Sequence, residues 1–138
     1  MAGGWNASII EEFHANDGRV GGRFEGTPLL LLHHRGAQSG IERVNPLAYQ
    51  DLGDGSYAVF ASKGGSDTNP DWYHNVKANP EVRLEVGTET FDAKARVAEG
   101  AERERIWEKQ KVMSPGFATY EKRTQREIPV VILESPET

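Results

Sequence analysis

Cysteine is missing from the 138-residue sequence, and its absence removes several chemistries together. Disulfide bonds, thiolate nucleophiles, iron–sulfur ligation and thiolate zinc sites all need cysteine. A chain without cysteine is compatible with a reducing compartment, so we expect a cytoplasmic protein. The four histidines, His14, His33, His34 and His74, do not have the H-E-x-x-H spacing. Because His33 and His34 would point to opposite faces of a strand, we expect solvated histidines and no metal site.

Long hydrophobic runs are also absent. The longest run, PLLLL at 28–32, has the length of a strand, whereas a helix needs about 20 apolar residues to cross a bilayer. The N-terminal stretch is polar and carries Glu11, Glu12 and Asp17, which is unlike the apolar segment of a signal peptide. We therefore expect no signal peptide and no stable membrane insertion.

Positive charge is scarce, since the net charge is −5 at pH 7. Nucleic-acid binding needs a basic footprint, so we expect no nucleic-acid partner. A negatively charged small ligand would need a local basic pocket on this acidic molecule. A chain of this length is enough for one domain and too short for two ordinary ones, which predicts a single domain over 1–138.

The motifs of three common enzyme classes are missing as well. No G-x-G-x-x-G follows a predicted strand, no G-x-x-x-x-G-K-[ST] occurs, and no G-x-S-x-G elbow is present. Nicotinamide-binding Rossmann folds, P-loop proteins and α/β-hydrolases therefore lose their main support.

Six segments have the composition and patterning of strands. Gly87-Thr88 between two alternating runs is a strong hairpin signal. Pro46 cannot donate to a ladder, so its strand should have an edge or a bulge there. The first and last segments are apolar without alternation, which is typical of strands covered on both faces. The six segments are 28–34, 43–50, 57–62, 82–86, 91–97 and 129–133.

Two helices are predicted from their start signals. Ser8 and Glu11 have capping-box spacing at the start of the first helix. Before the second helix, Asn69 can cap and Pro70 fits the first helical position. The second helix should stop near 78–80, where a proline follows.

Two further helices are expected at 101–113 and 117–124, the first packing through Ile106, Trp107 and Met113. Hairpins dominate the chain and the βαβ rhythm of a parallel sheet is absent. We therefore predict a mainly β protein with α elements, a closed or nearly closed antiparallel barrel of about six strands with flanking helices.

The first of three chemically varied clusters is RGAQSGIERVNPL at 35–47. It offers backbone N–H groups at glycines, the polar side chains of Gln38 and Ser39, and the cations Arg35 and Arg43. Such a turn can form a concavity for an anion. The alternative is an ordinary hairpin with solvated arginines.

The other two clusters flank the start of the second helix. SKGG at 62–65 combines small residues, which permit close approach to a flat ligand, with the positive charge of Lys63. Trp72, Tyr73 and Asn75 follow on the first turns of the helix. The alternatives are a flexible connection and a core role for Trp72. Together the three clusters suit a large, flat, anionic ligand.

These segments resemble one protein family in order and spacing. The segments GRVGGRFEGTPLLLL at 18–32, RGAQSGIERVNPLAY at 35–49 and ASKGG….NPDWYHNVKANPEV at 61–82 are similar to those of the deazaflavin-dependent nitroreductases. The likeness runs from about Asn6 to Glu134. Members of that family are split β-barrel proteins that use coenzyme F-420, an 8-hydroxy-5-deazaflavin.

The resemblance implies an oxidoreductase that passes a hydride from reduced coenzyme F-420 to an electron-poor small molecule, such as a nitroaromatic, quinone or conjugated carbonyl compound. It also implies that Tyr120 lies at the substrate side of the ring, as a candidate proton donor or orienting group. The implied cofactor-binding residues are Gln38, Ser39, Gly40 and Arg43 at the phosphate, Ala61, Ser62, Lys63, Gly64 and Gly65 at the ring, and Trp72, Tyr73 and Asn75 closing that side.

Three residues, in two places of the chain, depart from the family pattern. Ala37 and Gln38 stand where the family usually has a basic residue, and Phe117 stands where some relatives have tyrosine. Phosphate and tail binding would then either be weaker than in the family or rely on Arg35 and Lys63. The alternatives are an FMN-binding split-barrel oxidoreductase, a non-catalytic deazaflavin-binding protein and a barrel that binds nothing. Both a monomer and a homodimer are compatible with the sequence.

Overall fold

The computed structural model describes residues 3–20, 28–62 and 68–135, which contain six strands and four helices. The strands are β1 (Leu29–Arg35), β2 (Glu42–Asp51), β3 (Ser56–Phe60), β4 (Glu81–Val86), β5 (Glu89–Val97) and β6 (Val130–Glu134). They close into a barrel in the order β1-β2-β3-β6-β5-β4, and every neighbouring pair is antiparallel. The predicted antiparallel barrel is confirmed.

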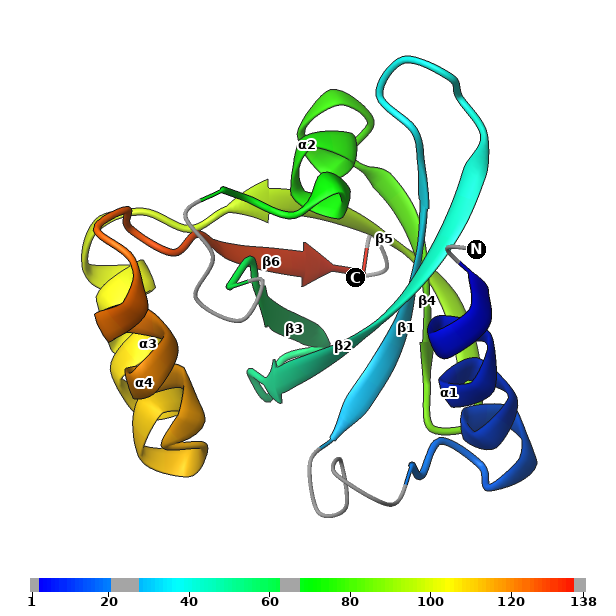
Figure 1. Cartoon of the computed structure of the whole chain (residues 1–138), viewed down its shortest axis with the longest axis horizontal. Helices are drawn as coiled ribbons and strands as arrows, with labels where there is room; N and C mark the ends of the chain where they lie inside the picture. Colours follow the sequence, from blue (N-terminus) through cyan, green and yellow to red (C-terminus); the bar gives the residue numbers. More distant parts are fainter. Residues whose placement is uncertain (1–2, 21–27, 63–67, 136–138) are drawn as a thin grey trace.

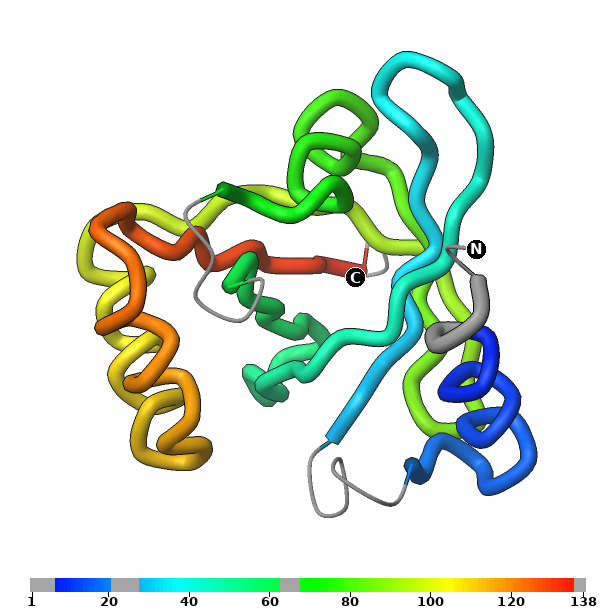
Figure 2. Tube along the Cα trace, viewed as in Figure 1, coloured from blue at the N-terminus to red at the C-terminus, as the bar shows by residue number. Residues whose placement is uncertain are grey.

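The helices lie outside the barrel. They are α1 (Gly3–Ala15), α2 (Asp71–Ala78), α3 (Gly100–Met113) and α4 (Gly116–Arg123). In Figure 1, α1 covers one side of the barrel, the α3–α4 pair lies on the opposite side, and α2 lies beside the protruding β1–β2 hairpin. The tube in Figure 2 shows α3 and α4 running alongside each other, away from the barrel. None of the helices in the described part of the chain is long and apolar enough to cross a membrane.

The two strands without alternation are covered on both faces, as predicted. On β1, Leu30 and Leu32 belong to the cluster inside the barrel, whereas Leu29 and Leu31 pack beneath α1. On β6, Val131 and Leu133 point inward, and Val130 and Ile132 pack with residues of α3. Because successive side chains of a strand point to opposite faces, a strand with two apolar neighbours needs apolar residues at every position.

The second strand has one edge that is largely unpaired within the described residues. It pairs with β1 from Ala48 to Glu42 but with β3 only from Tyr49 to Asp51. Pro46 lies in the stretch that has no partner on the β3 side, which is where a residue without an N–H is tolerated. The expectation of an edge at Pro46 is confirmed.

Details at three helix ends and one strand end differ from the sequence prediction. The first helix begins at Gly3, so Ser8 lies within it and does not start it. Pro70 is the N-cap of α2 without a side-chain cap bond, and Asn69 instead accepts a hydrogen bond from Arg126. Met113, expected on the packing side of its helix, is 54% exposed at the end of α3, so that part of the prediction is wrong, whereas Ile106 and Trp107 are buried as expected. The third strand ends at Phe60.

Candidate functional site

The turn between β1 and β2 is held by its own backbone. The N–H of Gly36 donates to the carbonyl of Ile41 at 2.9 Å, and the N–H of Gly40 donates to the carbonyl of Gly36 at 3.0 Å. Gly40 has φ +71°, a conformation that side chains of L-residues rarely adopt. Ser39 Oγ accepts from the N–H of Ile41 at 3.1 Å. Gln38, Ser39 and Gly40 are thus exposed on an ordered turn.

Two arginines flank this turn. Arg35 Nη1 donates to the carbonyl of Gly40 at 3.3 Å, so its guanidinium lies beside the turn. Arg43 is exposed, and it forms no ion pair or hydrogen bond with any residue that the structure describes. A cation without a carboxylate partner next to a glycine turn can bind an anion without first breaking an ion pair.

The turn contacts α2 through side-chain amides. Asn75 Oδ1 accepts from the N–H of Ala37 at 2.9 Å, and Asn79 Nδ2 lies 3.5 Å from the carbonyl of Gly36. Asn75 is only 7% exposed. The first and third clusters of the sequence therefore lie side by side, although Ala37 and Asn75 are 38 residues apart in the chain.

The predicted ring-binding residues that the structure describes are mostly buried. Ala61 is fully buried, and Ser62, Trp72 and Tyr73 are 9%, 5% and 8% exposed. Trp72 and Tyr73 belong to the cluster inside the barrel, so the core role left open for Trp72 is the one observed. Little of either aromatic side chain is left exposed for a ligand to contact.

The structure adds Arg126, which the sequence analysis missed. Its Nη2 donates to the carbonyl of Ser62 at 3.0 Å, and its Nη1 donates to Asn69 Oδ1 at 2.7 Å. One guanidinium therefore holds the two segments that enter and leave the connection between β3 and α2. The predicted site residues Lys63, Gly64 and Gly65 lie outside the described residues. An arginine distant in sequence carries no local signal for this role.

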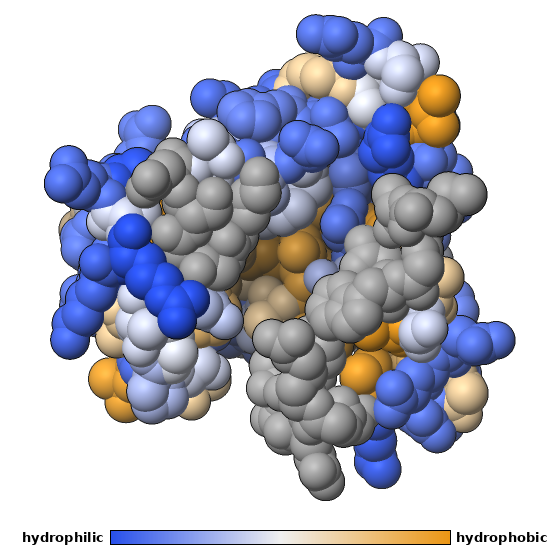
Figure 3. Space-filling view, in the orientation of Figure 1, coloured by the Kyte–Doolittle hydropathy of each residue, from blue (hydrophilic) through white to orange (hydrophobic). Residues whose placement is uncertain are grey.

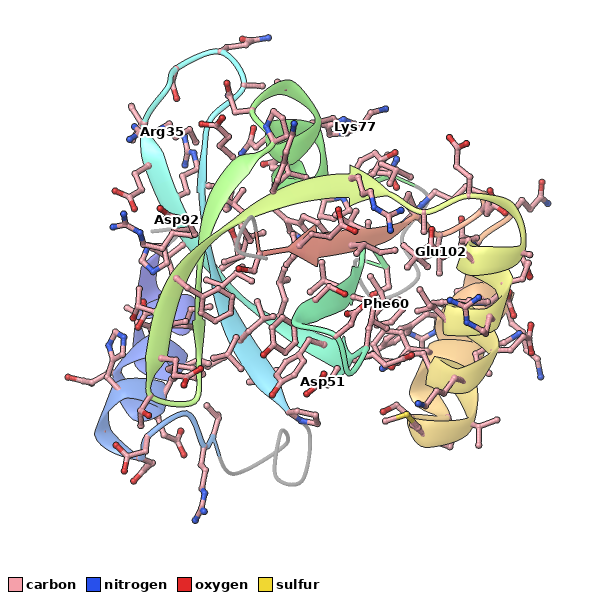
Figure 4. All side chains as sticks on the ribbon, turned by 180° about the vertical axis from the view of Figure 1, so that it is seen from behind. Arg35, Asp51, Phe60, Lys77, Asp92 and Glu102 are labelled. Atoms are coloured by element: carbon pink, nitrogen blue, oxygen red, sulfur yellow. The ribbon has the colours of Figure 1, made fainter. Side chains whose placement is uncertain are left out.

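Tyr120 lies on α4 in a row of aromatic side chains that begins at the end of β3. Phe60 contacts Phe117 with ring centroids 5.4 Å apart, and Phe117 contacts Tyr120 at 5.3 Å. In Figure 4, Phe60 lies between the barrel and the α3–α4 pair. The Tyr120 hydroxyl forms no hydrogen bond with the described residues, and its ring is half-buried. The hydroxyl is therefore available to a ligand.

Glu121 attaches α4 to α3. Trp107 Nε1 donates to Glu121 Oε2 at 2.7 Å, and Lys111 Nζ donates to Glu121 Oε1 at 3.0 Å. Burial raises the pKa of Glu121, but the hydrogen bonds from Trp107 and Lys111 outweigh it and bring the pKa below the ordinary value. No residue of α4 is buried, so this carboxylate has a large part in placing Tyr120.

The histidines are not all solvated, which corrects the sequence expectation. Glu85 accepts from His14 Nε2 at 2.7 Å and from His33 Nε2 at 2.5 Å. His34 is 2% exposed and lies between Asn45 and Asn75. Tertiary partners replace the water that the sequence pattern suggested. Across the described ranges, no three or more histidine, aspartate or glutamate side chains are grouped so that they could hold a metal ion.

Two depressions lie near the predicted site residues. Figure 3 shows a hollow with an apolar floor at the centre of the face that lies between the α3–α4 pair and β2. A second cavity, of about 420 Å³, opens on the other side of the β1–β2 hairpin. Arg35 and Asp92, which are labelled in Figure 4, are two of the residues that line this second cavity. It is lined by His33, His34, Arg35, Glu42, Glu81, Val82, Arg83, Asp92, Ala93 and Lys94. The apolar hollow suits a flat ring better than this highly charged cavity does.

Comparison with known proteins identifies the family. The model of the F-420H(2)-dependent quinone reductase family matches residues 6–135, nearly the whole chain. The chain belongs to this family. An F-420H(2)-dependent quinone reductase of Mycobacterium tuberculosis (strain ATCC 25618 / H37Rv) is 38% identical over 125 residues, which cover 88% of this chain and 83% of the relative. The resemblance to a family of deazaflavin-dependent reductases is thereby confirmed.

Solved structures agree with this family assignment. One is titled as the structure of an F-420-H2 dependent reductase; it is 44% identical with a TM-score of 0.71, and the match covers 78% of this chain and 94% of that chain. Another, titled as a domain-swapped dimer, is 41% identical with a TM-score of 0.73 and 93% coverage of both chains. The predicted split-barrel fold is confirmed by these neighbours.

Proposed function

We propose that this reductase-family protein transfers a hydride from reduced coenzyme F-420 to a quinone. The observation that carries the proposal is the family match over residues 6–135. It is supported by Arg43, which has no partner in the part of the chain that the structure describes and lies next to an exposed glycine turn, and by the apolar hollow on the adjoining face (Figure 3). A flat cofactor with a negatively charged arm needs both features, an apolar surface for its ring and a cation for its arm.

The described residues fit such a cofactor. We infer that Gln38, Ser39 and Gly40 face its phosphate, with Arg43 as the charge partner, and that Ala61 and Ser62 lie beside its ring. Gln38 can donate a hydrogen bond but carries no charge, so Arg43 and Arg35 provide the positive charge of the described turn. Lys63, Gly64 and Gly65, which lie outside the described residues, are included among the proposed ring-binding residues on the basis of the sequence alone.

When bound, the reduced deazaflavin supplies the hydride, so the protein supplies binding, orientation and electrostatics. Tyr120 is our candidate for the group that donates a proton to the acceptor oxygen as negative charge develops there. Its hydroxyl has no hydrogen-bond partner in the described residues, and its ring is oriented by Phe117 at 5.3 Å. The aromatic row from Phe60 through Phe117 to Tyr120 connects α4 with the end of β3.

The decisive experiment is a titration of the purified protein with coenzyme F-420 and, separately, with FMN, followed by quenching of tryptophan fluorescence. We expect saturable quenching by F-420 and much weaker quenching by FMN. Reduced F-420 with menadione should then be reoxidised faster than in the absence of protein. Tight F-420 binding without reoxidation would support the non-catalytic binding protein instead, and preference for FMN would overturn the cofactor assignment.

We also propose that the protein can form a homodimer, because the 41%-identical structure described above is titled as a domain-swapped dimer. Light scattering coupled to size-exclusion chromatography measures this directly, and a monomer mass at all concentrations would contradict it. The cytoplasmic location expected from the cysteine-free sequence stays a prediction.

A further inference from the structure

A line of four polar groups connects the barrel interior to the β1–β2 turn. Asn45 Oδ1 lies 2.7 Å from His34 Nε2, and His34 Nδ1 lies 3.2 Å from Asn75 Nδ2. Asn75 Oδ1 lies 2.9 Å from the backbone nitrogen of Ala37. The line starts on β2, crosses β1 and α2, and ends in the turn.

The direction of every hydrogen bond in this line follows from its last member. A backbone N–H can only donate, so Ala37 requires the oxygen of the Asn75 amide, and the Asn75 nitrogen must then face His34. An amide nitrogen only donates, so His34 Nδ1 must be the acceptor, and its ring proton sits on Nε2. Asn45 accordingly presents its oxygen. Only one tautomer of neutral His34 satisfies all four groups.

We propose that neutral His34 is a positioning residue that, through Asn75, holds the Ala37 N–H and so sets the turn for the anionic arm of the cofactor. The inference rests on the proposed function for its last step. Asn75 then acts by placing the turn, since one oxygen and one N–H of its amide are already engaged. A proton added to Nδ1 of His34 would place two donors, this N–H and the Asn75 amide N–H, against each other. Asn75 could relieve this contact only by turning its amide, and it would then lose the hydrogen bond from the Ala37 N–H.

The surroundings of His34 keep it neutral while leaving it reachable by protons. Burial lowers the pKa of His34 most, the hydrogen bond to Asn45 opposes this, and the nearby positive charges of Arg43 and His33 lower it further. His34 lines the cavity of about 420 Å³, through which water can reach it. Its charged neighbours there are His33 and Arg35 on β1, Glu42 on β2, Glu81 and Arg83 on β4, and Asp92 and Lys94 on β5. On α2 the facing group is the neutral Asn75.

Three substitutions separate this role from general packing. His34→Gln restores an acceptor for Asn75 and a donor for Asn45 but cannot take up a proton, so it should hold the turn at every pH. His34→Leu removes both bonds. Asn75→Asp replaces the donor by a carboxylate oxygen, which favours a proton on His34 Nδ1. His74→Gln is the matched control, because His74 is exposed on α2 and lies outside the line.

The experiment has one readout without cofactor and one with it. Long-range proton–nitrogen NMR correlations of the free protein report the His34 tautomer, and hydrogen exchange reports protection of the Ala37 amide between about pH 8 and pH 5. Isothermal titration calorimetry with coenzyme F-420 gives Kd over the same range. Circular dichroism confirms that each variant is folded.

We expect an Nε2–H tautomer and an Ala37 amide that loses protection as the pH falls, with Kd rising about three- to tenfold in parallel. His34→Gln should remove both pH dependences, His34→Leu should resemble the acid form at all pH values, and His74→Gln should follow the wild type. Asn75→Asp should keep His34 doubly protonated to higher pH.

An Nδ1–H tautomer in the wild type, or full Ala37 protection in folded His34→Leu, would overturn the inference while leaving the proposed function intact. A failure of the proposed function would look different. If the tautomer and Ala37 protection behave as expected but wild-type protein binds no F-420 at any pH, the proposed function and the cofactor step of the inference both fail.

Discussion

The arginine side chains of the barrel differ sharply in what they have available for a ligand. Arg83 is paired with Asp92 at 3.1 Å, and Arg96 contacts both Glu102 and Glu134. Arg43, in contrast, has no partner among the described residues. A charge without a partner keeps its full electrostatic attraction for an anion, and this is the physical basis for giving Arg43 a binding role.

Arg43→Ala should weaken coenzyme F-420 binding by about three- to tenfold at low salt, because a charge-assisted contact with the phosphate is lost. The difference from the wild type should shrink at high salt, where exposed charges are screened. Calorimetric Kd values at two ionic strengths test this. Arg83→Ala removes an exposed arginine that is already paired with Asp92 and is the matched control. Equal losses for both variants would show only a general effect of net charge.

Tyr120→Phe should lower turnover of menadione by about tenfold or more, because a positioned proton donor is removed while the ring contact with Phe117 is kept. The Kd for F-420 should not change. Stopped-flow reoxidation of the reduced cofactor measures the effect, with Tyr57→Phe on the barrel side as the control. Full turnover in Tyr120→Phe would assign the proton to solvent.

Whole elements are placed by a few long-range hydrogen bonds more than by their own caps. Neither α2 nor α4 has a side-chain cap bond. The start of α2 follows Asn69, which Arg126 contacts from a segment 57 residues away, and α4 is attached to α3 through Glu121. Because short helices are marginal by themselves, these tertiary bonds and the packing of their apolar side chains against the barrel together hold them in place.

Arg126→Ala should weaken F-420 binding, since the carbonyl of Ser62 and the amide of Asn69 would no longer share a donor. Arg126→Lys should weaken F-420 binding less than Arg126→Ala does. A lysine ammonium keeps the positive charge but cannot donate to both acceptors in the geometry of a guanidinium, so only part of the wild-type affinity should remain. Lys122→Ala, a nearby exposed cation on α4, is the control. Wild-type affinity in Arg126→Ala would show that the ring-binding segment is positioned without it.

Glu121→Ala should lower the free energy of unfolding by about 1 kcal/mol, since the buried Trp107 N–H loses its acceptor. Glu121→Gln keeps an oxygen for Trp107 but loses the charge facing Lys111, so its loss should be smaller. Urea unfolding followed by tryptophan fluorescence measures both. Glu108→Ala removes the other carboxylate partner of Lys111 without touching α4 and serves as the control. If Glu108→Ala and Glu121→Ala lower the free energy of unfolding equally, the hydrogen bond from Trp107 to Glu121 does not contribute measurably to stability.

At the scale of the whole molecule, stability should depend on pH through groups that connect separate elements. Burial raises the pKa of Glu85, but the hydrogen bonds from His33 and His14 outweigh it and bring the pKa below 4.5. The hydrogen bonds from Arg96 lower the pKa of Glu102 below the same value. Burial lowers the pKa of His34 from 6.5. All three groups bind protons more readily in the unfolded chain than in the folded barrel.

Stability should therefore be greatest near neutral pH and fall in two steps as acid is added. The His34 contribution is present above 6.5 and is lost as the pH falls through its lower folded pKa. The carboxylate contributions are present above 4.5 and are lost as the pH falls further. Urea unfolding at a series of pH values measures this. His34→Gln should flatten the first step and leave the second, and an unchanged first step would contradict the role of His34.

The sequence by itself determined the elements of the barrel. Alternating and doubly apolar strands, the Gly87-Thr88 hairpin and the proline that follows the second helix are local signals, because strand pleat, turn conformation and helix termination depend on neighbouring residues. The family resemblance was also readable, since the order of the segments is a property of the chain. Start signals were less reliable: the cap expected at Asn69 was wrong because Arg126 competes for its side chain.

Only the tertiary structure decided which distant polar groups meet. His34 meets Asn75 across 41 residues, and Arg126 meets Ser62 across 64. No local pattern marks these pairs, because barrel closure and the docking of α2 bring them together. The physical reason is that a buried polar group must find a partner wherever the fold places it. This is why His34, which the sequence analysis expected in solvent, lies buried between Asn45 and Asn75.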